Sequence, residues 1–370
     1  LISEGKWTKK AELFLSTMLG LVCIYVSVLV TSGLGREFPK PEIDYQKLGK
    51  DQLEAVEKII LKRSQAKNVI LFIGDGMGIS AITAGRILQG QLKNKSGEEN
   101  QLFFEKFPHV ALSKTYDNNN QVPDSASSGT SIMSGEKVNY NTVGVSRKVE
   151  EYDCKAASDN TTWLTSIADL AQKHNLGTGI VTTVRVTHAT PAAVYAHSAS
   201  RYWEGNLGDN KCPENIKDIG VQLVEDETAK NLKVVMGGGR APMGNPSHDT
   251  TSLYPNVKRK DGRNLVEEWK KDREDRNIKY KYVDNLKDLK SININDVEHI
   301  MGLFHDDYLS PETDKPENEP TLTDMVEVAI KLLEKEENGY FLMVEGGQID
   351  EALHRSEARF ALYELLALDD

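Results

Sequence analysis

The sequence lacks an excess of basic residues, the usual mark of a chain that binds nucleic acid. Lysine and arginine total 45 against 56 aspartates and glutamates, which gives a formal net charge of −11. Proteins that grip a phosphate backbone present a basic face, so we expect no nucleic-acid partner. A small phosphorylated ligand is not excluded, because bound metal ions and a single arginine override the global sign of charge locally.

Cysteine is also scarce. Cys23 lies in an apolar run, and Cys154 and Cys212 are the other two. These two pair as a disulfide if the protein is exported; otherwise they are unrelated free thiols. Internal repeats and low-complexity tracts are absent. The hydrophobic content of 39% and charged content of 27% are globular values, and 370 residues suffice for one large α/β domain or two ordinary ones.

Charge is missing altogether from Leu13 to Gly35, and three lysines lie ahead of that apolar segment. Positive residues before an apolar run predict a secretory signal peptide or a signal anchor; a buried core helix is the alternative. We therefore assign residues 1–36 to this segment and 37–370 to one folded domain. The Asn-X-Ser/Thr sequons at Asn94 and Asn160 agree with export.

Apolar strand-like runs alternate with helical patterns along the domain. The predicted strands are Val69–Ile73, Gly179–Val184, Lys233–Met236 and Tyr340–Val344; the predicted helices are Asp51–Arg63, a helix from about Ile79, Ser125–Ser134, Trp163–His174 and Leu322–Lys335. This alternation predicts an α/β fold, doubly wound, with a mainly parallel central sheet and helices on both faces. The polar stretch from Ser247 to Asn295 is expected to be a surface insertion with some helix. Helical periodicity from Ser356 continues to Asp370 without a stop signal, so we expect the sequence to be a fragment that is incomplete at its carboxyl end.

Polar residues follow three of the predicted strands, where ligands bind in open α/β sheets. Asp75 lies between Gly74 and Gly76, which favours either a metal ligand or a tight turn. Thr190 follows the second strand and is expected either to bind metal or to cap a helix.

Glu345 follows the last predicted strand, with Asp350 and His354 close behind. Residues four apart share a helix face, so Asp350 and His354 suit either zinc or a solvated ion pair. Glu345 suits a harder ion such as magnesium.

Ser125 follows Asp124 at the predicted start of a helix. Backbone N–H groups and the helix dipole favour negative charge at such a place. A hydroxyl there can attack an anionic phosphate ester. Arg201 is our candidate for gripping the phosphate with two hydrogen bonds.

These motifs together resemble the alkaline phosphatases, and the animal, membrane-tethered type most closely. The resemblance extends from about residue 37 to the end and rests on segments in the family's order. They are Gly74–Gly78, Val122–Ala126, His188–Pro191, Tyr195–His197 with Arg201, Gly237–Arg240, and Val344–Gly347 with Asp350 and His354.

The resemblance implies a site with two zinc ions and one magnesium. Ser125 is the implied nucleophile and zinc ligand, and Asp75 bridges a zinc and the magnesium. Thr190 and Glu345 complete the protein share of the magnesium site, and Asp350 and His354 hold the other zinc. Arg201 binds phosphate, Asp124 steadies it, and His188 lies behind the magnesium ligands. Cys154 and Cys212 match a disulfide of the animal enzymes.

The sequence departs from the family pattern in three places. The later Asp-His pair and histidine that complete the zinc sites are not in this sequence. Phe304 and Glu319 match a calcium site, but His305 stands where an acidic residue is usual. Glu351-Ala352-Leu353-His354 replaces the frequent His-Gly-His-His, and of that motif only the ligand His354 remains.

The resemblance implies hydrolysis of phosphate monoesters through a phosphoserine. It also implies an extracellular homodimer, to which Asp51–Arg63 contributes, tethered to the membrane by a glycolipid (GPI) anchor or by its N-terminal segment. One alternative is a related phosphodiesterase or sulfatase, against which the Asp124-Ser125-Ala126 context argues. The other is a non-catalytic surface binding protein on the same scaffold.

Overall fold

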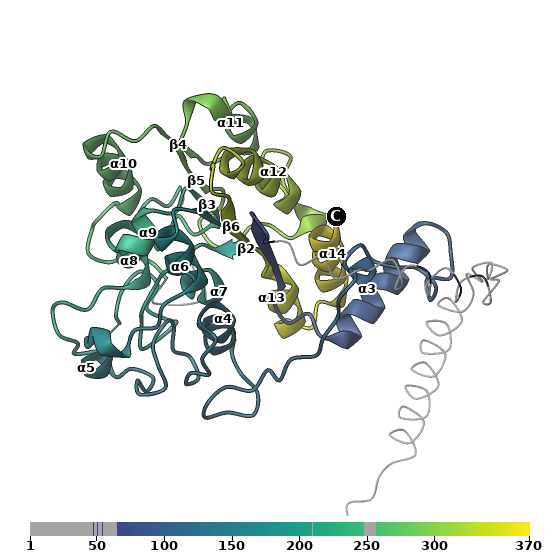
Figure 1. Cartoon of the computed structure of the whole chain (residues 1–370), viewed down its shortest axis with the longest axis horizontal. Coiled ribbons are helices and arrows are strands. Elements are labelled where there is room, and N and C mark those ends of the chain that lie inside the picture. Colours follow the sequence, from purple (N-terminus) through teal and green to yellow (C-terminus); the bar gives the residue numbers. More distant parts are fainter. Residues whose placement is uncertain (1–46, 48–49, 51–53, 55–64, 209, 248–256) are drawn as a thin grey trace, which may run out of the picture.

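A six-stranded, all-parallel sheet organises the chain (Figure 1). The computed structural model describes residues 47, 50, 54, 65–208, 210–247 and 257–370. The strand order is β1-β6-β2-β3-β5-β4. The strands are β1 (Val69–Gly74), β2 (Gly177–Arg185), β3 (Val234–Gly238), β4 (Tyr280–Val283), β5 (His299–Leu303) and β6 (Tyr340–Gly346).

The four predicted strands are confirmed, as is the α/β class. The helix α4 (Ser125–Ser134) has the predicted bounds. The other helices are α3 (Ile79–Leu92), α5 (Cys154–Ala157), α6 (Ile167–Lys173), α7 (Ala189–Ala192), α8 (Ile219–Glu225), α9 (Glu227–Lys230), α10 (Leu265–Asp275), α11 (Leu286–Lys290), α12 (Leu322–Leu333), α13 (Gln348–His354) and α14 (Ala358–Asp369), with short 3-10 turns η1 (Phe104–Lys106), η2 (Asn160–Thr162), η3 (Ile294–Asp296) and η4 (Glu312–Asp314). The predicted apolar segment Leu13–Gly35 lies outside the described residues, as does nearly all of Asp51–Arg63. Among the described residues, no helix has both the length and the apolar character needed to cross a bilayer.

The prediction of a surface insertion with some helix at Ser247–Asn295 is confirmed for the helices and wrong for a strand. That stretch contains α10, α11 and the edge strand β4, which pairs in parallel with the buried strand β5. Within β4, Tyr280 and Tyr282 are partly buried and alternate with the exposed Lys281. A half-buried strand with one solvated face has this composition.

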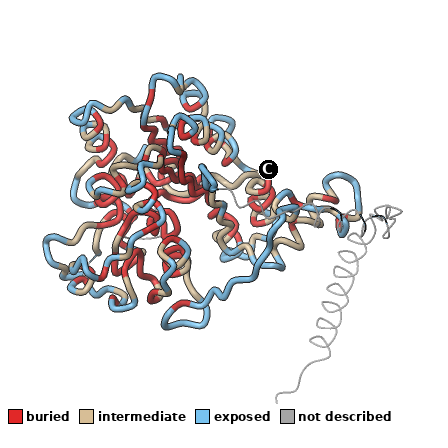
Figure 2. The backbone as a smooth tube through the Cα atoms, viewed as in Figure 1, coloured by how far each residue is buried: buried red, intermediate tan, exposed pale blue. Residues whose placement is uncertain are grey.

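Helices cover both faces of the sheet because side chains alternate along its strands. In β2, Ile180 packs into one apolar cluster with α6, α8 and α10, and the next residue, Val181, packs into another with α12. Both clusters consist of buried residues. Figure 2 shows that buried residues concentrate in the centre of the molecule. The two-layered core fixes the strands, and with them the loops at their carboxyl ends.

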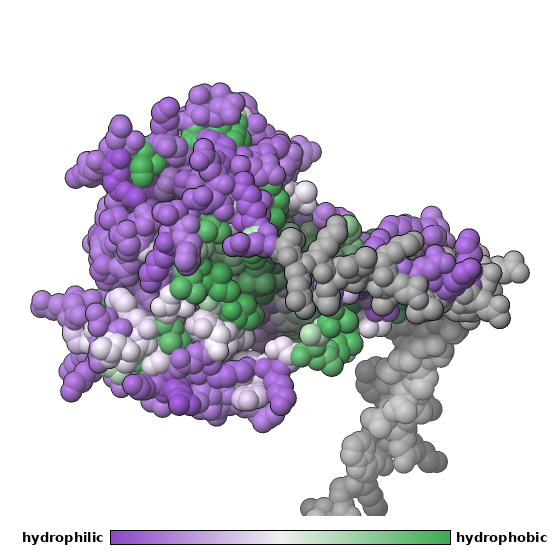
Figure 3. All heavy atoms as spheres, in the orientation of Figure 1, coloured by the Kyte–Doolittle hydropathy of each residue, from purple (hydrophilic) through white to green (hydrophobic). Residues whose placement is uncertain are grey.

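β1 lies at one end of the sheet and, within the described residues, pairs only with β6. Val69 and Phe72 on this strand are about half exposed, at 48% and 49%. Figure 3 shows apolar residues gathered near the middle of the molecule among mostly hydrophilic ones.

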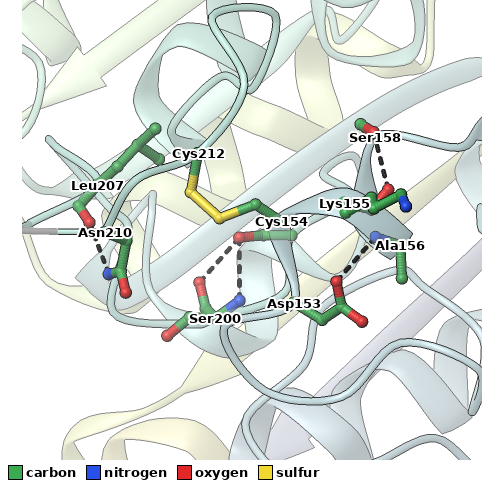
Figure 4. The surroundings of a disulfide bond; sticks show 10 residues. Asp153, Cys154, Lys155, Ala156, Ser158, Ser200, Leu207, Asn210 and Cys212 are labelled. Carbon is green, nitrogen blue, oxygen red and sulfur yellow. Dashed lines mark hydrogen bonds between the residues drawn. A yellow bond between two sulfur atoms is a disulfide. The ribbon is translucent and has the colours of Figure 1, made fainter.

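Cys154 and Cys212 form the disulfide that the resemblance implied (Figure 4). The bond joins the start of α5 to the loop ahead of α8 and closes 58 residues of chain, which include β2. The alternative of two free thiols is therefore wrong.

Glu364 gives the fold a testable pH dependence. This α14 carboxyl is buried and accepts a hydrogen bond from Glu312 N at 2.6 Å. Burial raises its pKa from 4.5 to about 7, with Lys315 opposing and Glu312 and Glu319 reinforcing the shift. A carboxyl with a raised pKa in the folded state stabilises the fold below about pH 4.5, and this contribution is lost as the pH rises to about 7.

We expect the free energy of unfolding to fall by up to about 3 kcal/mol across that interval. Urea titrations at several pH values would measure it. Glu364→Gln keeps an oxygen for Glu312 N and should flatten the curve; equal pH slopes in the two proteins would contradict the prediction.

Candidate active site

The carboxyl ends of β1, β2 and β6 meet at one edge because these strands are parallel neighbours. Ile73 and Thr182 both pair with Glu345 in the sheet register, and Gly74 pairs with Gly346. The loop after β1 then brings Asp75 to the same edge. Gly76, at φ +65°, allows this loop to approach α13, because a Cβ there would lie 2.5 Å from Asp350 Oδ1.

Ser125 begins α4 with its hydroxyl directed at Asp75. Its Oγ donates to Asp75 Oδ2 at 2.8 Å, and the residue is 9% exposed. Asp124 is the N-cap of this helix and accepts from Ala126 N and Ser127 N at 2.9 and 3.0 Å. This cap fixes the first turn, so Ser125 is held at the positive end of the helix dipole.

Asp75, which is partly exposed, and Glu345, which is fully buried, are two carboxyls close together at this edge. Burial raises the pKa of Asp75, and Asp350 adds to that shift. Burial also raises the pKa of the fully buried Glu345, reinforced by the charge of Asp75. Among the described residues, Glu345 Oε1 has no hydrogen-bond partner. Anionic oxygens gathered in this way fit a bound cation, which would supply the missing charge.

Thr190 belongs to this cluster and does not cap a helix. The N-cap of α7 is His188, which makes no capping hydrogen bond through its side chain. The Thr190 hydroxyl instead lies close enough to the Glu345 carboxyl to lower its pKa, and Thr182 Oγ1 donates to Glu345 Oε2 at 2.5 Å. The capping alternative for Thr190 is thus wrong. Thr182 was not predicted, although its place opposite Glu345 in the register marks it.

Arg201 lies between an anion and a histidine. Its Nη1 donates to Asp124 Oδ2 at 3.0 Å, and its Nη2 donates to His188 Nε2 at 2.9 Å. Burial raises the pKa of Asp124, but Arg201 and three backbone N–H donors outweigh it and hold that pKa below its usual value. For His188, complete burial holds the pKa well below its usual value, reinforced by Arg201 and Arg185. A neutral ring can therefore accept from Arg201.

Asp350 and His354 lie on one face of α13, as their spacing predicts. His354 Nε2 is 3.2 Å from Asp350 Oδ2, and the His354 side chain is 76% exposed. This contact is compatible with both predicted roles, an ion pair and a zinc-binding pair. Within the part of the chain that the structure describes, no three His, Cys, Asp or Glu side chains gather into a complete metal-binding group.

A cavity of about 880 Å³ joins these residues. Its lining includes Asp75, Asp124, Ser125, His188, Thr190, Arg201, Asp350 and His354. Glu345 lies behind this lining, fully buried. The convergence of the three strand ends and one helix start is therefore a property of the fold.

A polar network that sequence reasoning did not find lines part of the cavity wall. Tyr308 OH donates to Glu351 Oε1 at 2.9 Å, and the Glu351 carboxylate lies 3.9 Å from His188 Nε2. The Tyr308 ring in turn lies 4.3 Å from Arg185, which pairs with Glu204. Nothing local in the sequence marks Tyr308, because its partners come from β2 and α13.

The two residues matched to calcium lie in different surroundings. The Phe304 ring packs in the core cluster beside β6 and α12. Glu319 accepts from Ser310 N at 2.6 Å and lies 3.5 Å from Lys315 Nζ. The ammonium group of Lys315 thus already faces the carboxylate.

Arg201 provides a test of this geometry. A lysine retains the charge but loses the planar fork that can hold two oxygens. We expect Arg201→Lys to weaken binding of inorganic phosphate about 10-fold and Arg201→Ala about 100-fold, by loss of charge-assisted hydrogen bonds. Isothermal titration calorimetry with inorganic phosphate measures the dissociation constant directly. Equal constants in all three proteins would contradict the assignment.

A parallel sheet with a serine at a helix start and carboxyls at the strand ends defines an α/β protein with a candidate hydrolytic site. Solved structures of alkaline phosphatases share this fold. An alkaline phosphatase from the Antarctic bacterium TAB5 superposes with a TM-score of 0.62 and 25% identity over 83% of this chain and 73% of that chain. A cold-active alkaline phosphatase from Shewanella sp. gives 0.61 and 26% over 82% and 62%.

The chain belongs to the alkaline phosphatase family, whose sequence model matches residues 66–370. It is 42% identical to an alkaline phosphatase of Gadus morhua over 91% of this chain and 71% of that protein. For the tissue-nonspecific isozyme of Gallus gallus the values are 40%, 96% and 68%. For a membrane-bound alkaline phosphatase of Bombyx mori they are 41%, 82% and 56%. The chain thus spans roughly half to seven tenths of the length of these relatives.

Proposed function

We propose that the protein hydrolyses phosphate monoesters through a phosphoserine intermediate on Ser125. The observation that carries this proposal is the placement of the Ser125 hydroxyl at the start of α4, bonded to Asp75 and sharing one cavity with Arg201. Family membership supports it independently. A serine attacks phosphorus when a neighbouring group takes its proton and positive groups stabilise the transferred phosphoryl oxygens.

The chain's own residues divide these tasks. Ser125 Oγ attacks phosphorus, and Asp75, which accepts its hydrogen bond, orients it and takes its proton. The Oγ–P bond forms as the ester P–O bond breaks, and the substrate alcohol leaves after it picks up a proton from solvent. Arg201 holds phosphoryl oxygens, and Asp124 keeps the guanidinium in place through their 3.0 Å contact. His188 supports Arg201 from the other side. Water then attacks the phosphoserine, which frees inorganic phosphate and restores the hydroxyl.

Two zinc ions and one magnesium are the cofactors of this proposal. Asp75, Thr190 and Glu345 would hold magnesium, Asp350 and His354 one zinc, and Asp75 with Ser125 the other. The oxygen-rich set fits magnesium and the imidazole–carboxylate pair fits zinc. The orphaned Glu345 Oε1 supports a cation there. Bound metals would supply positive charge that lowers the pKa of a hydroxyl or water and stabilises the transferred phosphate.

A panel of substrates tests the reaction type. Full-length protein loaded with zinc and magnesium should hydrolyse an aryl phosphate monoester far faster than the matching diester or sulfate ester. A preference for the diester or sulfate would replace the proposal with a related esterase. No turnover, together with no bound zinc by metal analysis, would favour the non-catalytic binding protein.

The cellular location of the protein and its attachment to the membrane are part of the same proposal. We place it in the secretory pathway and on the extracellular face of the cell membrane, tethered by a lipid anchor or by residues 1–36, with residues 37–370 as the catalytic domain. The disulfide supports export. A homodimer, N-glycans and a calcium ion at Phe304 and Glu319 complete it. The ammonium group of Lys315 would compete with calcium for the Glu319 carboxylate. Measuring bound calcium in Lys315→Ala and in the unaltered protein therefore tests this site directly.

A further inference from the structure

A cavity of about 520 Å³ lies apart from the candidate active site, and among the described residues the two share no lining residue. It meets α4 at Thr130 and Ser134, whereas Ser125 and Ser128 of the same helix line the active-site cavity. The rest of its wall includes residues of η2, the start of α6 and the junction of α8 with α9. The proposed hydrolysis of phosphate esters makes no use of this space.

Trp163 forms a fixed aromatic part of the wall. Its Nε1 donates to Ala157 O at 2.9 Å, and its ring stacks on His197 with centroids 4.4 Å apart and an interplanar angle of 8°. The residue is 41% exposed, so part of the indole surface is open to a ligand. An aromatic ring that is already held in place loses little freedom on binding, and the face of its π system attracts cations.

His197, which stacks on Trp163, is neutral at pH 7. Burial lowers its pKa below the usual value, against the opposing effects of Leu164 O and of the Asp226 and Asp169 charges. His197 Nε2 lies 3.1 Å from Leu164 O, which can only accept, so Nε2 carries the ring proton. Nδ1 is therefore an acceptor, and this buried atom has no hydrogen-bond partner in the part of the chain that the structure describes.

The charged groups that line the cavity are all negative. The lining contains four carboxylates and, within the described residues, no lysine or arginine; the carboxylates are those of Asp169, Glu225, Asp226 and Glu227. The first three have cationic partners outside the lining, namely Lys173, Lys217 and Arg263. Glu227 accepts only a neutral hydrogen bond, from Asn231 Nδ2 at 2.9 Å. The cavity therefore favours a positively charged ligand.

An organic cation fits these walls better than a metal ion does. Across the described ranges, no three His, Cys, Asp or Glu side chains gather into a group that could hold a metal. An alkylammonium ion combines a charge for the carboxylates with an apolar chain for the indole. Its N–H groups are also hydrogen-bond donors, the kind of partner that His197 Nδ1 lacks.

We propose that this cavity binds a protonated aliphatic amine, with the carbon chain against Trp163 and the ammonium group among the carboxylates. A neighbouring cavity of about 400 Å³ also has Trp163, His197 and Asp226 in its lining. This adjoining space leaves room for the chain of the amine to extend past the indole. The site is separate from Ser125 and does not depend on the proposed reaction.

Isothermal titration calorimetry with n-butylamine tests the proposal on the full chain. The amine is protonated at pH 7, as a lysine side chain is, and n-butanol is the matched neutral ligand. We expect n-butanol to bind at least about 10-fold more weakly than n-butylamine. Trp163→Ala should weaken binding of the amine about 10-fold and Trp163→Phe about threefold, because the cation–π attraction is strongest for tryptophan.

A pair of glutamate variants tests the contribution of charge. Glu227→Gln removes a carboxylate from the lining and should weaken binding of n-butylamine about threefold. Glu267→Gln is the matched control, because Glu267 pairs with Lys270 on α10 and does not line the cavity. Its dissociation constant should equal that of the unaltered protein.

Three results would overturn the proposal. They are the absence of saturable binding of n-butylamine, equal affinity for n-butanol, and a dissociation constant that Trp163→Ala leaves unchanged. Should Trp163→Ala fail to fold, unchanged constants in both Trp163→Phe and Glu227→Gln would decide against the site. None of these measurements reads phosphatase activity, so a failure here is distinct from a failure of the proposed reaction.

Discussion

Ser125→Ala should lower kcat for an aryl phosphate by at least about 10⁴-fold in the metal-loaded, full-length protein. Loss of a nucleophile removes the covalent route altogether, and the remaining groups then support only slow attack by water. The substitution deletes one hydroxyl, which donates to Asp75, so the fold should persist. Steady-state kinetics measures the loss, and circular dichroism checks the fold.

Ser131→Ala is the matched control for that experiment. Ser131 lies on the same helix and donates to Ser127 O at 2.8 Å, yet it does not line the cavity. Its kinetics should stay within about twofold of the unaltered protein. Labelled phosphate should be recovered on residue 125 after acid quenching of the unaltered protein and of Ser131→Ala. Turnover by Ser125→Ala at the normal rate would end the assignment.

Arg185→Met should cost about 3–5 kcal/mol of unfolding free energy, the largest stability effect we expect. Arg185 is 1% exposed and donates through Nε and Nη2 to Glu204 at 2.8 and 2.6 Å. It also pairs with Asp307. Removing the guanidinium leaves the buried Glu204 carboxylate without its cation, retaining only a hydrogen bond from Thr187. Urea denaturation measures the loss.

The double variant Arg185→Met with Glu204→Met separates pairing from packing. Replacing both partners removes the stranded charge, so the double change should cost less than Arg185→Met alone. A double variant that is less stable than the single one by a further 2 kcal/mol or more would show that packing, not charge, dominates at this position.

The sequence predicted the strands that contain a mostly apolar run, because such runs occur where both faces of a sheet are covered. β4 and β5 were missed for different reasons. The Tyr-Lys-Tyr-Val run of β4 carries a lysine on its solvated face. β5 opens with His299 and contains Gly302, which interrupts the apolar pattern even though every residue of the strand is buried.

The candidate site residues were predicted from local signals, and the roles assigned to them stay predictions. A carboxylate between glycines, or a serine after a capping aspartate, is visible in a few adjacent letters. Contacts that depend on how two strands align cannot be seen in adjacent residues. Thr182 meets Glu345 because β2 and β6 pair in one alignment. The Tyr308–Glu351 hydrogen bond likewise joins a loop after β5 to α13, and only the folded chain brings these two together.

The pairing of β1 with β6 has a consequence for how the protein is made. Ile73 and Glu345 are opposite each other in the sheet, although 272 positions separate them in the sequence. At a ribosomal speed of about 5–20 residues per second, β1 waits roughly 15–55 seconds for its neighbour. During that delay the apolar strand β1 is unpaired and can aggregate with other chains. Chaperone binding during translation should therefore determine the yield of soluble protein.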